Sequence, residues 1–278
     1  MSGIDSIKKN SIVKLLYEAP YRVRMYAQVC KRSRVNRMNL TGEDVLKIER
    51  YKNIHKGRRC FIVLTGPSLK PEDLALIKDE ISFTVNSGYK AYGINGWEPW
   101  YYATADGGEV AQEMLQKALS NEYGYKGLFT DYDNPIADDR LTKLPSDSRL
   151  VFRMNSILNK LFPGLWTTGI MSSDISKRIY NGKTVLCMVL QIAAYMGFDS
   201  IYLMGADFNY SGASTHSSIS QEKILDQSWD KRKTEDEMVF QMNDFAKDAK
   251  RKGIRVFNTT MNSKLECFEK VELKSLFV

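Results

Sequence analysis

From residue 60 to residue 260 the chain alternates short apolar runs with segments of helical periodicity. The helical segments are 72–80, 107–119, 183–197 and 236–253. The apolar runs have the length and the β-branched and aromatic content of buried strands. They lie at 60–66, 81–87, 100–106, 127–133, 149–154, 200–208 and 254–260. This alternation predicts an α/β fold with a Rossmann-like, doubly wound, mainly parallel sheet. Ligands of such sheets bind beyond the carboxyl ends of the strands, so residues that follow each run are site candidates.

The first run ends in a turn made of Thr65, Gly66, Pro67 and Ser68. A glycine lets the backbone approach a ligand closely, and a hydroxyl beside the next helix suits a phosphate. The turn has neither the lysine of a Walker A loop nor the three glycines of a dinucleotide fingerprint. Phosphate binding and an ordinary turn both fit it.

Polar side chains also follow the second and third runs. Asn86 and Ser87 end the second run, and Asp106 ends the third. Such residues hydrogen-bond ribose hydroxyls or a base edge, and they also cap helices. Three of them at one edge of the sheet favour a nucleotide site.

Two further segments contribute candidates at the same edge. Lys183 and Thr184 precede an apolar helix, where free amides favour an anion, with simple capping as the alternative. Asp207 and Phe208 end the sixth run, and Asp207 is expected to face the cleft while Phe208 is placed to stack on a base or sugar.

The chain has two histidines, and no nucleophile triad or zinc pattern accompanies them. His216 lies in a long polar segment, 209–232, where it is either a general base or an exposed loop residue. His55 is expected at the surface. Asp131 and Asp133 have the spacing of a metal-binding DxD motif, which also arises by chance in acidic loops.

The positive charge is concentrated at the start of the chain. The net charge is +7, and residues 1–40 hold nine Lys or Arg against Asp5 and Glu18, which is also +7. The neutral remainder argues against nucleic-acid binding. Residues 5–17 and 21–38 are predicted basic helices that either pack on the domain or bind anionic lipid.

Neither secretion nor membrane spanning is expected. The longest apolar stretch, 185–198, is too short to span a bilayer, and no signal-peptide pattern precedes it. The four cysteines show no CxxC pairing, which fits a reducing cytoplasm. A cytoplasmic protein, peripheral at the inner face of the membrane if the basic segment binds lipid, is the expectation.

With these residues assembled, the chain resembles the bacterial sialyltransferases of glycosyltransferase family 42. It also resembles their relatives, the hydroxymethylpterin-diphosphokinase-like (MptE-like) proteins of surface-glycan clusters. The matching stretches are 62–69, 84–89, 182–210 and 257–277. The resemblance implies a GT-A-like variant of the Rossmann fold, a cytidine nucleotide and a lid over the site. Residues 1–57 would form a basic helical extension, and residues 58–278 the catalytic domain with its lid at about 209–235.

The resemblance also assigns roles to the candidate residues. Thr65 stands where the family has an asparagine beside the phosphate, and Val185 replaces a serine after Thr184. Phosphate contacts are implied for Thr65, Gly66, Ser68, Lys183 and Thr184. Contacts to ribose and base are implied for Asn86, Asp106 and Phe208. His216 would deprotonate the acceptor hydroxyl.

The function that follows is an inverting, metal-independent transfer of an acidic sugar from a CMP-sugar to a glycan or lipid-linked glycan acceptor in surface-polysaccharide synthesis. No cofactor is expected. One alternative is Mg²⁺-dependent pyrophosphate transfer from ATP to a pterin-like alcohol, and another is a non-catalytic, nucleotide-binding subunit of a glycan machine. The resemblance also allows a homo-oligomer.

Overall fold

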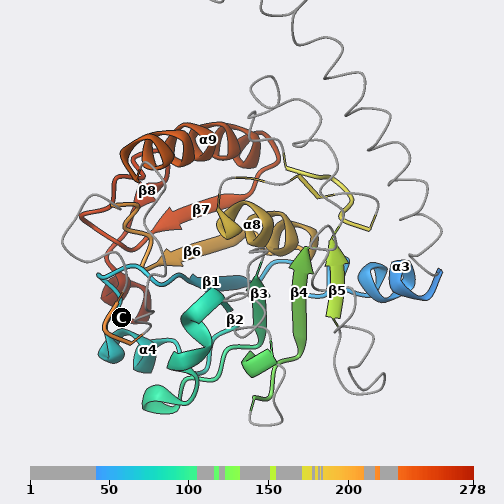
Figure 1. The fold of residues 1–278 in the computed structure, drawn as a ribbon, viewed down its shortest axis with the longest axis horizontal. Helices are drawn as coiled ribbons and strands as arrows, with labels where there is room; N and C mark the ends of the chain where they lie inside the picture. Colours follow the sequence, from blue (N-terminus) through green and yellow to red (C-terminus); the bar gives the residue numbers. More distant parts are fainter. Residues whose placement is uncertain are drawn as a thin grey trace, which may run out of the picture.

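The computed structural model describes most of the α/β region and none of the first 41 residues. The described residues are 42–104, 116–118, 123–131, 151–154, 171–176, 179–180, 182, 184–209, 217–219 and 231–278. Within them, one parallel sheet organises the chain in the order β5-β4-β3-β2-β1-β6-β7-β8 (Figure 1).

Each of the seven strands predicted from the sequence is present, and an eighth, two-residue strand is added at one edge. The strands are β1 (Arg59–Val63), β2 (Ser82–Val85), β3 (Tyr101–Thr104), β4 (Gly127–Asp131), β5 (Val151–Met154), β6 (Ser200–Met204), β7 (Arg255–Asn258) and β8 (Glu269–Lys270). All seven strand pairings are parallel. The sheet is thus wholly parallel where a mainly parallel one was predicted.

The strand order reverses its direction between β1 and β6. The chain proceeds from β1 to β5 on one side and from β6 to β8 on the other. Val63 of β1 pairs with Thr84 of β2 and with Met204 of β6, so the segments that follow all three strands emerge together. A reversal of this kind opens a crevice at the carboxyl edge, where α/β proteins bind ligands.

Alternating side chains of β1 enter two separate cores, as expected for a strand buried on both faces. Cys60 and Ile62 join the larger core, which includes the helices α8 (Val185–Tyr195) and α9 (Lys231–Arg251). Phe61 and Val63 join the smaller core, with α4 (Pro71–Leu76). Figure 1 shows α8 and α9 on the opposite side of the sheet from α4. The doubly wound architecture is therefore confirmed.

The helices follow their local sequence signals. Helix α8 consists almost wholly of buried apolar residues, and the Thr184 hydroxyl caps its first turn. Proline opens α4, where its missing N–H costs no hydrogen bond. Helix α9 begins five residues before its predicted start at 236. The remaining elements are α3 (Gly42–Glu49) and the 3-10 helices η1 (Asn86–Ala91), η2 (Ile94–Gly96) and η3 (Leu273–Phe277).

His55 is buried, so the expectation that it lies at the surface is wrong. Its side chain is 7% exposed, its ring stacks on Phe198 at 4.7 Å, and its Nε2 lies 2.7 Å from the Tyr101 hydroxyl oxygen. Burial, with smaller contributions from Arg58 and Lys126, lowers the pKa of His55 to about 4. The basic neighbours suggested exposure, but the turn at 50–57 folds this ring against β3.

The predicted helices at 5–17 and 21–38 lie outside the described residues, as does most of the predicted lid. No described helix has both the length and the apolar character needed to cross a membrane.

Candidate functional site

The turn between β1 and α4 packs so closely on the segment after β6 that it requires glycine. The Gly66 N–H donates to the Gly205 carbonyl at 3.0 Å. A Cβ on Gly66 would lie 2.1 Å from an Asp207 carboxylate oxygen and 2.3 Å from the Gly205 carbonyl oxygen. Gly205 has φ +62°, and a Cβ there would lie 2.7 Å from the Leu64 carbonyl oxygen. Only glycine fits at either position without a backbone shift.

Asp207 joins the two segments that flank the switch in strand order. A single carboxylate oxygen of Asp207 accepts two hydrogen bonds, from the Ser68 hydroxyl at 2.7 Å and from the Ser68 N–H at 3.3 Å. The structure therefore brings Gly66, Ser68 and Asp207 together. Both hydrogen-bond donors of Ser68 are bonded to the Asp207 carboxylate. A phosphate at Ser68 would therefore have to compete with that carboxylate.

Buried polar atoms without a partner gather where β2 and β3 end. Thr84 and Thr104 are 0% and 1% exposed, Ser87 is 1% exposed, and Asn86 is half-buried. The three hydroxyl oxygens and the Asn86 side-chain carbonyl oxygen form no hydrogen bond. Four of the six such atoms in the described part of the chain belong to this group, which we call the open edge. Buried polar atoms are normally paired, so this unpaired group at the carboxyl edge is a candidate for hydrogen bonds to a ligand.

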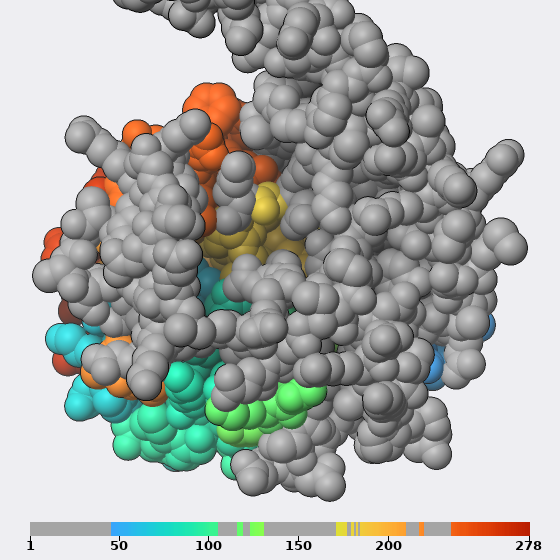
Figure 2. Space-filling model, viewed as in Figure 1, coloured from blue at the N-terminus to red at the C-terminus, as the bar shows by residue number. Residues whose placement is uncertain are grey.

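The backbone at the open edge adopts an uncommon conformation. Asn86 has φ +46°, which asparagine tolerates better than most residues, and its carbonyl accepts a hydrogen bond from the Tyr102 hydroxyl at 3.0 Å. A Cβ on Gly88 would lie 2.2 Å from the Thr84 hydroxyl oxygen. The fold thus holds the chain close around the Thr84 hydroxyl. Figure 2 shows the segment that follows β2 in teal green on this face of the molecule.

The segment after β6, in contrast, is fixed by the loop between β7 and β8. The Ala206 N–H donates to the Thr260 hydroxyl at 3.0 Å, and the Ser263 hydroxyl donates to the Ala206 carbonyl. The Lys264 N–H donates to the Asp207 carbonyl at 3.0 Å. Sequence reasoning did not assign these roles, although the hydroxyl-rich stretch after the last strand was the available signal.

Thr84 and Thr104 were also missed, for a different reason. Both lie inside apolar runs, where the pattern predicts only burial. The available signal was that each is a polar residue near the carboxyl end of its run.

Phe208 and Thr184 have structural roles in the described arrangement. Phe208 is 6% exposed, packs within the larger core and has φ +53°. Its ring is therefore not open to a base, and stacking on a nucleotide stays a prediction. The Thr184 hydroxyl accepts the Leu186 N–H at 3.3 Å, which is the capping role weighed against anion binding.

The described cysteines are poor nucleophile candidates. Burial raises the pKa of the Cys187 thiol to about 12 and that of Cys267 to about 11. Burial also raises the pKa of Cys60 well above its ordinary value. All three thiols therefore stay protonated near neutral pH.

Three predicted site residues lie outside the described part of the chain: His216, Asp106 and Lys183. The base, the acidic residue after β3 and the cation before α8 therefore remain predictions. Pro67 is exposed at the tip of the β1–α4 turn. Among the described residues, no three His, Cys, Asp or Glu side chains are placed to hold a metal ion together.

A wholly parallel, doubly wound sheet with a polar open edge beside its switch point defines a Rossmann-like fold with a candidate ligand site at the carboxyl edge. Residues 37–213 match the family model described as 6-hydroxymethylpterin diphosphokinase MptE-like. The chain belongs to this MptE-like family.

One solved structure shares the fold at low sequence identity. It is the MAf glycosyltransferase from Magnetospirillum magneticum AMB-1, with a TM-score of 0.50 and 19% identity. The match covers 84% of this chain and 38% of that one, so this chain corresponds to well under half of the glycosyltransferase. A sequence search of the curated proteins finds no match.

Proposed function

We propose that this protein is a glycosyltransferase that binds a CMP-sugar across the carboxyl ends of β1, β2 and β3. The observation that carries the proposal is the open edge, with its four unpaired buried oxygens. Three are hydroxyl oxygens that both donate and accept, and one is an amide carbonyl that accepts, a set that suits ribose hydroxyls and a pyrimidine edge. The MAf glycosyltransferase has the same fold, whereas the description of the family names a diphosphokinase, the second candidate below.

In this proposal the reaction is a single displacement. The acceptor hydroxyl oxygen forms a bond to the anomeric carbon of the sugar. The bond between that carbon and the phosphate oxygen breaks, and CMP leaves with the electron pair. The acceptor proton passes to a base, the role predicted for His216. The acceptor would be a glycan or lipid-linked glycan, with the enzyme at the cytoplasmic face of the membrane.

The described residues would position the nucleotide rather than transfer the proton. Thr84 and Ser87 would bind ribose or base, and Thr65 would lie beside the phosphate. The backbone bonds of the segment after β6 keep Asp207 and Ser68 in place. Preorganised donors of this kind lower the cost of ordering the site when the substrate binds.

A second candidate function is diphosphate transfer from ATP to a pterin-like alcohol. Asp207 favours it, because a carboxylate beside the turn repels a bare phosphate but would bind a phosphate-bound Mg²⁺. In this reaction the alcohol oxygen attacks the β-phosphorus, the bond from that phosphorus to the α,β-bridging oxygen breaks, and AMP leaves. The alcohol proton passes to a base.

The test is calorimetric titration of the full chain with CMP, CDP, UDP, GDP and ATP, each with and without Mg²⁺. Tight binding of CMP or CDP without metal, together with CMP release from a CMP-sugar, supports the first function. Binding of ATP alone, only with Mg²⁺, and AMP release support the second and overturn the first.

A variant pair links the result to the open edge. Thr104→Val should weaken nucleotide binding about tenfold, which corresponds to one lost hydrogen bond of about 1.4 kcal/mol. Ser82→Ala, at the opposite end of β2, should leave nucleotide affinity unchanged. Equal affinities of the two variants would place the nucleotide elsewhere.

A further inference from the structure

A cavity lies beside the β1–α4 turn. Its volume is about 480 Å³, within the usual range for small-ligand sites. Ser68 lines it, so the cavity and the switch point share a wall. The other walls come from the start of α4, the end of β6, the β7–β8 loop and η3.

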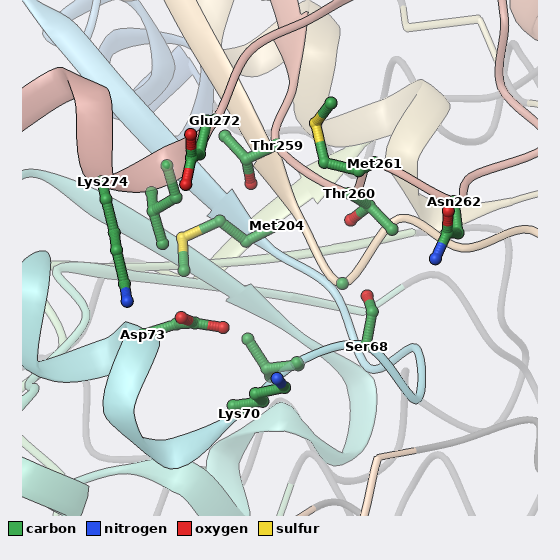
Figure 3. A pocket seen from close by; sticks show the side chains of 13 residues that line it. Ser68, Lys70, Asp73, Met204, Thr259, Thr260, Met261, Asn262, Glu272 and Lys274 are labelled. Atoms are coloured by element: carbon green, nitrogen blue, oxygen red, sulfur yellow. The ribbon is translucent and has the colours of Figure 1, made fainter.

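Four charged side chains line this cavity: Lys70, Asp73, Glu272 and Lys274. Figure 3 shows Lys274 and Glu272 on one wall, and Lys70 and Asp73 on the facing wall. In the part of the chain that the structure describes, no ion pair or side-chain hydrogen bond engages any of the four. Two cations and two anions, of which Lys70, Glu272 and Lys274 are exposed to solvent, thus line one cavity without a protein partner.

The floor of the cavity between these charges is apolar. Met204 is 2% exposed, Leu69 is 5% exposed and Leu273 is 8% exposed. Figure 3 places the Met204 sulfur between the two charged walls. An apolar floor beneath polar walls suits a sugar ring, whose C–H face packs on apolar side chains while its hydroxyls point outward.

The charges narrow the ligand class further. Carboxylates only accept hydrogen bonds, so sugar hydroxyls satisfy Asp73 and Glu272. Ammonium groups only donate, and their strongest partner is an anionic acceptor. A neutral sugar would leave Lys70 and Lys274 without such a partner. A sugar that carries a carboxylate satisfies all four side chains.

The loop that forms one wall of the cavity also holds the segment that carries Asp207. Thr260 lines the cavity, and its hydroxyl accepts the Ala206 N–H. The hydrogen bond from Ala206 to the Thr260 side chain therefore links the wall of the cavity to the segment that carries Asp207. Thr84, Asn86, Ser87 and Thr104 of the open edge are not among the residues that line the cavity.

We propose that this cavity binds the acceptor as the terminus of an acidic glycan, with its carboxylate at Lys70 and Lys274 and its hydroxyls at Asp73 and Glu272. The proposal rests on the proposed glycosyltransferase function. It adds the chemical class of the acceptor and a site separate from that of the nucleotide.

The cavity contains two methionines that report on binding. Met204 and Met261 both line it, whereas Met238 and Met242 lie on α9. We would label the methionine methyl groups of the full chain with carbon-13 and titrate the protein with glucuronate. The Met204 and Met261 signals should shift and saturate, and those of Met238 and Met242 should not. Glucose, the neutral counterpart, should bind at least tenfold more weakly.

Charge-neutralising variants locate the binding. Lys274→Gln should weaken glucuronate binding about tenfold and leave CMP affinity unchanged. Lys78→Gln, on an exposed lysine outside the cavity, is the matched control and should change neither affinity. Both substitutions are at the surface, and circular dichroism would verify the fold.

The outcomes separate the two proposals. Absent or equal shifts with glucuronate and glucose overturn the acidic acceptor, whether or not CMP binds. Competition between CMP and glucuronate also overturns it, because the cavity would then belong to the donor. If no nucleotide binds in the calorimetric test, the proposed function fails, while glucuronate binding still identifies the cavity as an acidic-sugar site.

Discussion

Buried polar groups are hydrogen-bonded at the amino ends of β2 and β3 but lack partners at the carboxyl ends of the same strands. At the amino ends, the Trp97 indole N–H donates to the Ser82 hydroxyl at 3.0 Å, and His55 pairs with the Tyr101 hydroxyl. At the carboxyl ends, the hydroxyls of Thr84 and Thr104 have no partner. The same two strands therefore begin in a closed polar network and end in an open one.

This difference distinguishes the part of the sheet whose buried polar groups are paired within the protein from the part where we propose that a ligand binds. A paired buried group adds about 1 kcal/mol of stability, whereas an unpaired one costs about 1–3 kcal/mol. In our proposal, a bound ligand supplies the partners that this unpaired set lacks. Substitutions at both ends of the strands test this contrast.

The largest loss of stability is expected at Gly66, where the turn after β1 packs against the segment after β6. Gly66→Ala should lower the free energy of unfolding by at least about 3 kcal/mol, because its Cβ would overlap Asp207 and Gly205. Gly57→Ala is the control: it has φ +77° but no atom within 4 Å of the added Cβ, so it should cost only about 1 kcal/mol. Urea denaturation of both variants measures the difference, and similar losses would contradict the close packing of this turn.

The closed amino end should make stability depend on pH. The pKa of His55 is about 4 in the folded chain, below the 6.5 of an unfolded histidine, so acid protonates the unfolded state first. Its contribution to stability is complete above pH 6.5 and is lost as the pH falls toward 4. Between pH 7 and pH 4.5 this loss should be about 2 kcal/mol.

The measurement for His55 is the free energy of unfolding of wild type and His55→Gln across this pH range. The variant should lose less stability on acidification than wild type. His216→Ala removes the other histidine and should retain the wild-type pH dependence. Parallel curves for wild type and His55→Gln would show that His55 is not held neutral.

Ser82→Ala tests the amino end of β2 by removing one hydroxyl oxygen. The substitution leaves the fully buried Trp97 indole N–H without its acceptor, and it should cost about 1.5 kcal/mol of unfolding free energy. Thermal and urea denaturation should agree on the loss. A neutral result would mean that Trp97 finds another acceptor and that this end is less closed than its geometry indicates.

The sequence predicted the sheet because its signal is local and strong. Each strand is an apolar run bounded by turn residues, and burial on both faces makes such runs continuous. The site was predicted less completely, because pairing between side chains is not local. Nothing near Ser68 in the sequence shows that Asp207, 139 residues later, accepts both of its donors.

The same limit explains the error at His55 and the omission of Thr84. The neighbours of His55 in the chain are basic, but its neighbours in space are Tyr101 and Phe198. Thr84 was included in an apolar run because the run as a whole is buried. Only the folded structure shows that its hydroxyl is left without a partner.

The smallest change in stability, and the most direct test of the contrast, is expected for Ser87→Ala. Ser82 and Ser87 are both serines at 0% and 1% exposure, but only Ser82 is paired. Removing the unpaired Ser87 hydroxyl should leave ligand-free stability unchanged or raise it by about 0.5 kcal/mol, because no bond is lost and a desolvated group is removed.

Saturating CMP should reverse the order of stability of Ser87→Ala and wild type. With CMP bound, Ser87→Ala should be less stabilised than wild type, because the removed hydroxyl can no longer bond to the ligand. Thermal denaturation of both proteins with and without CMP measures this crossover. Ser82→Ala should instead be less stable than wild type by the same amount in both conditions. A ligand-free loss at Ser87 as large as that at Ser82 would mean that the two ends do not differ, and the open edge would then lose its standing as the nucleotide site.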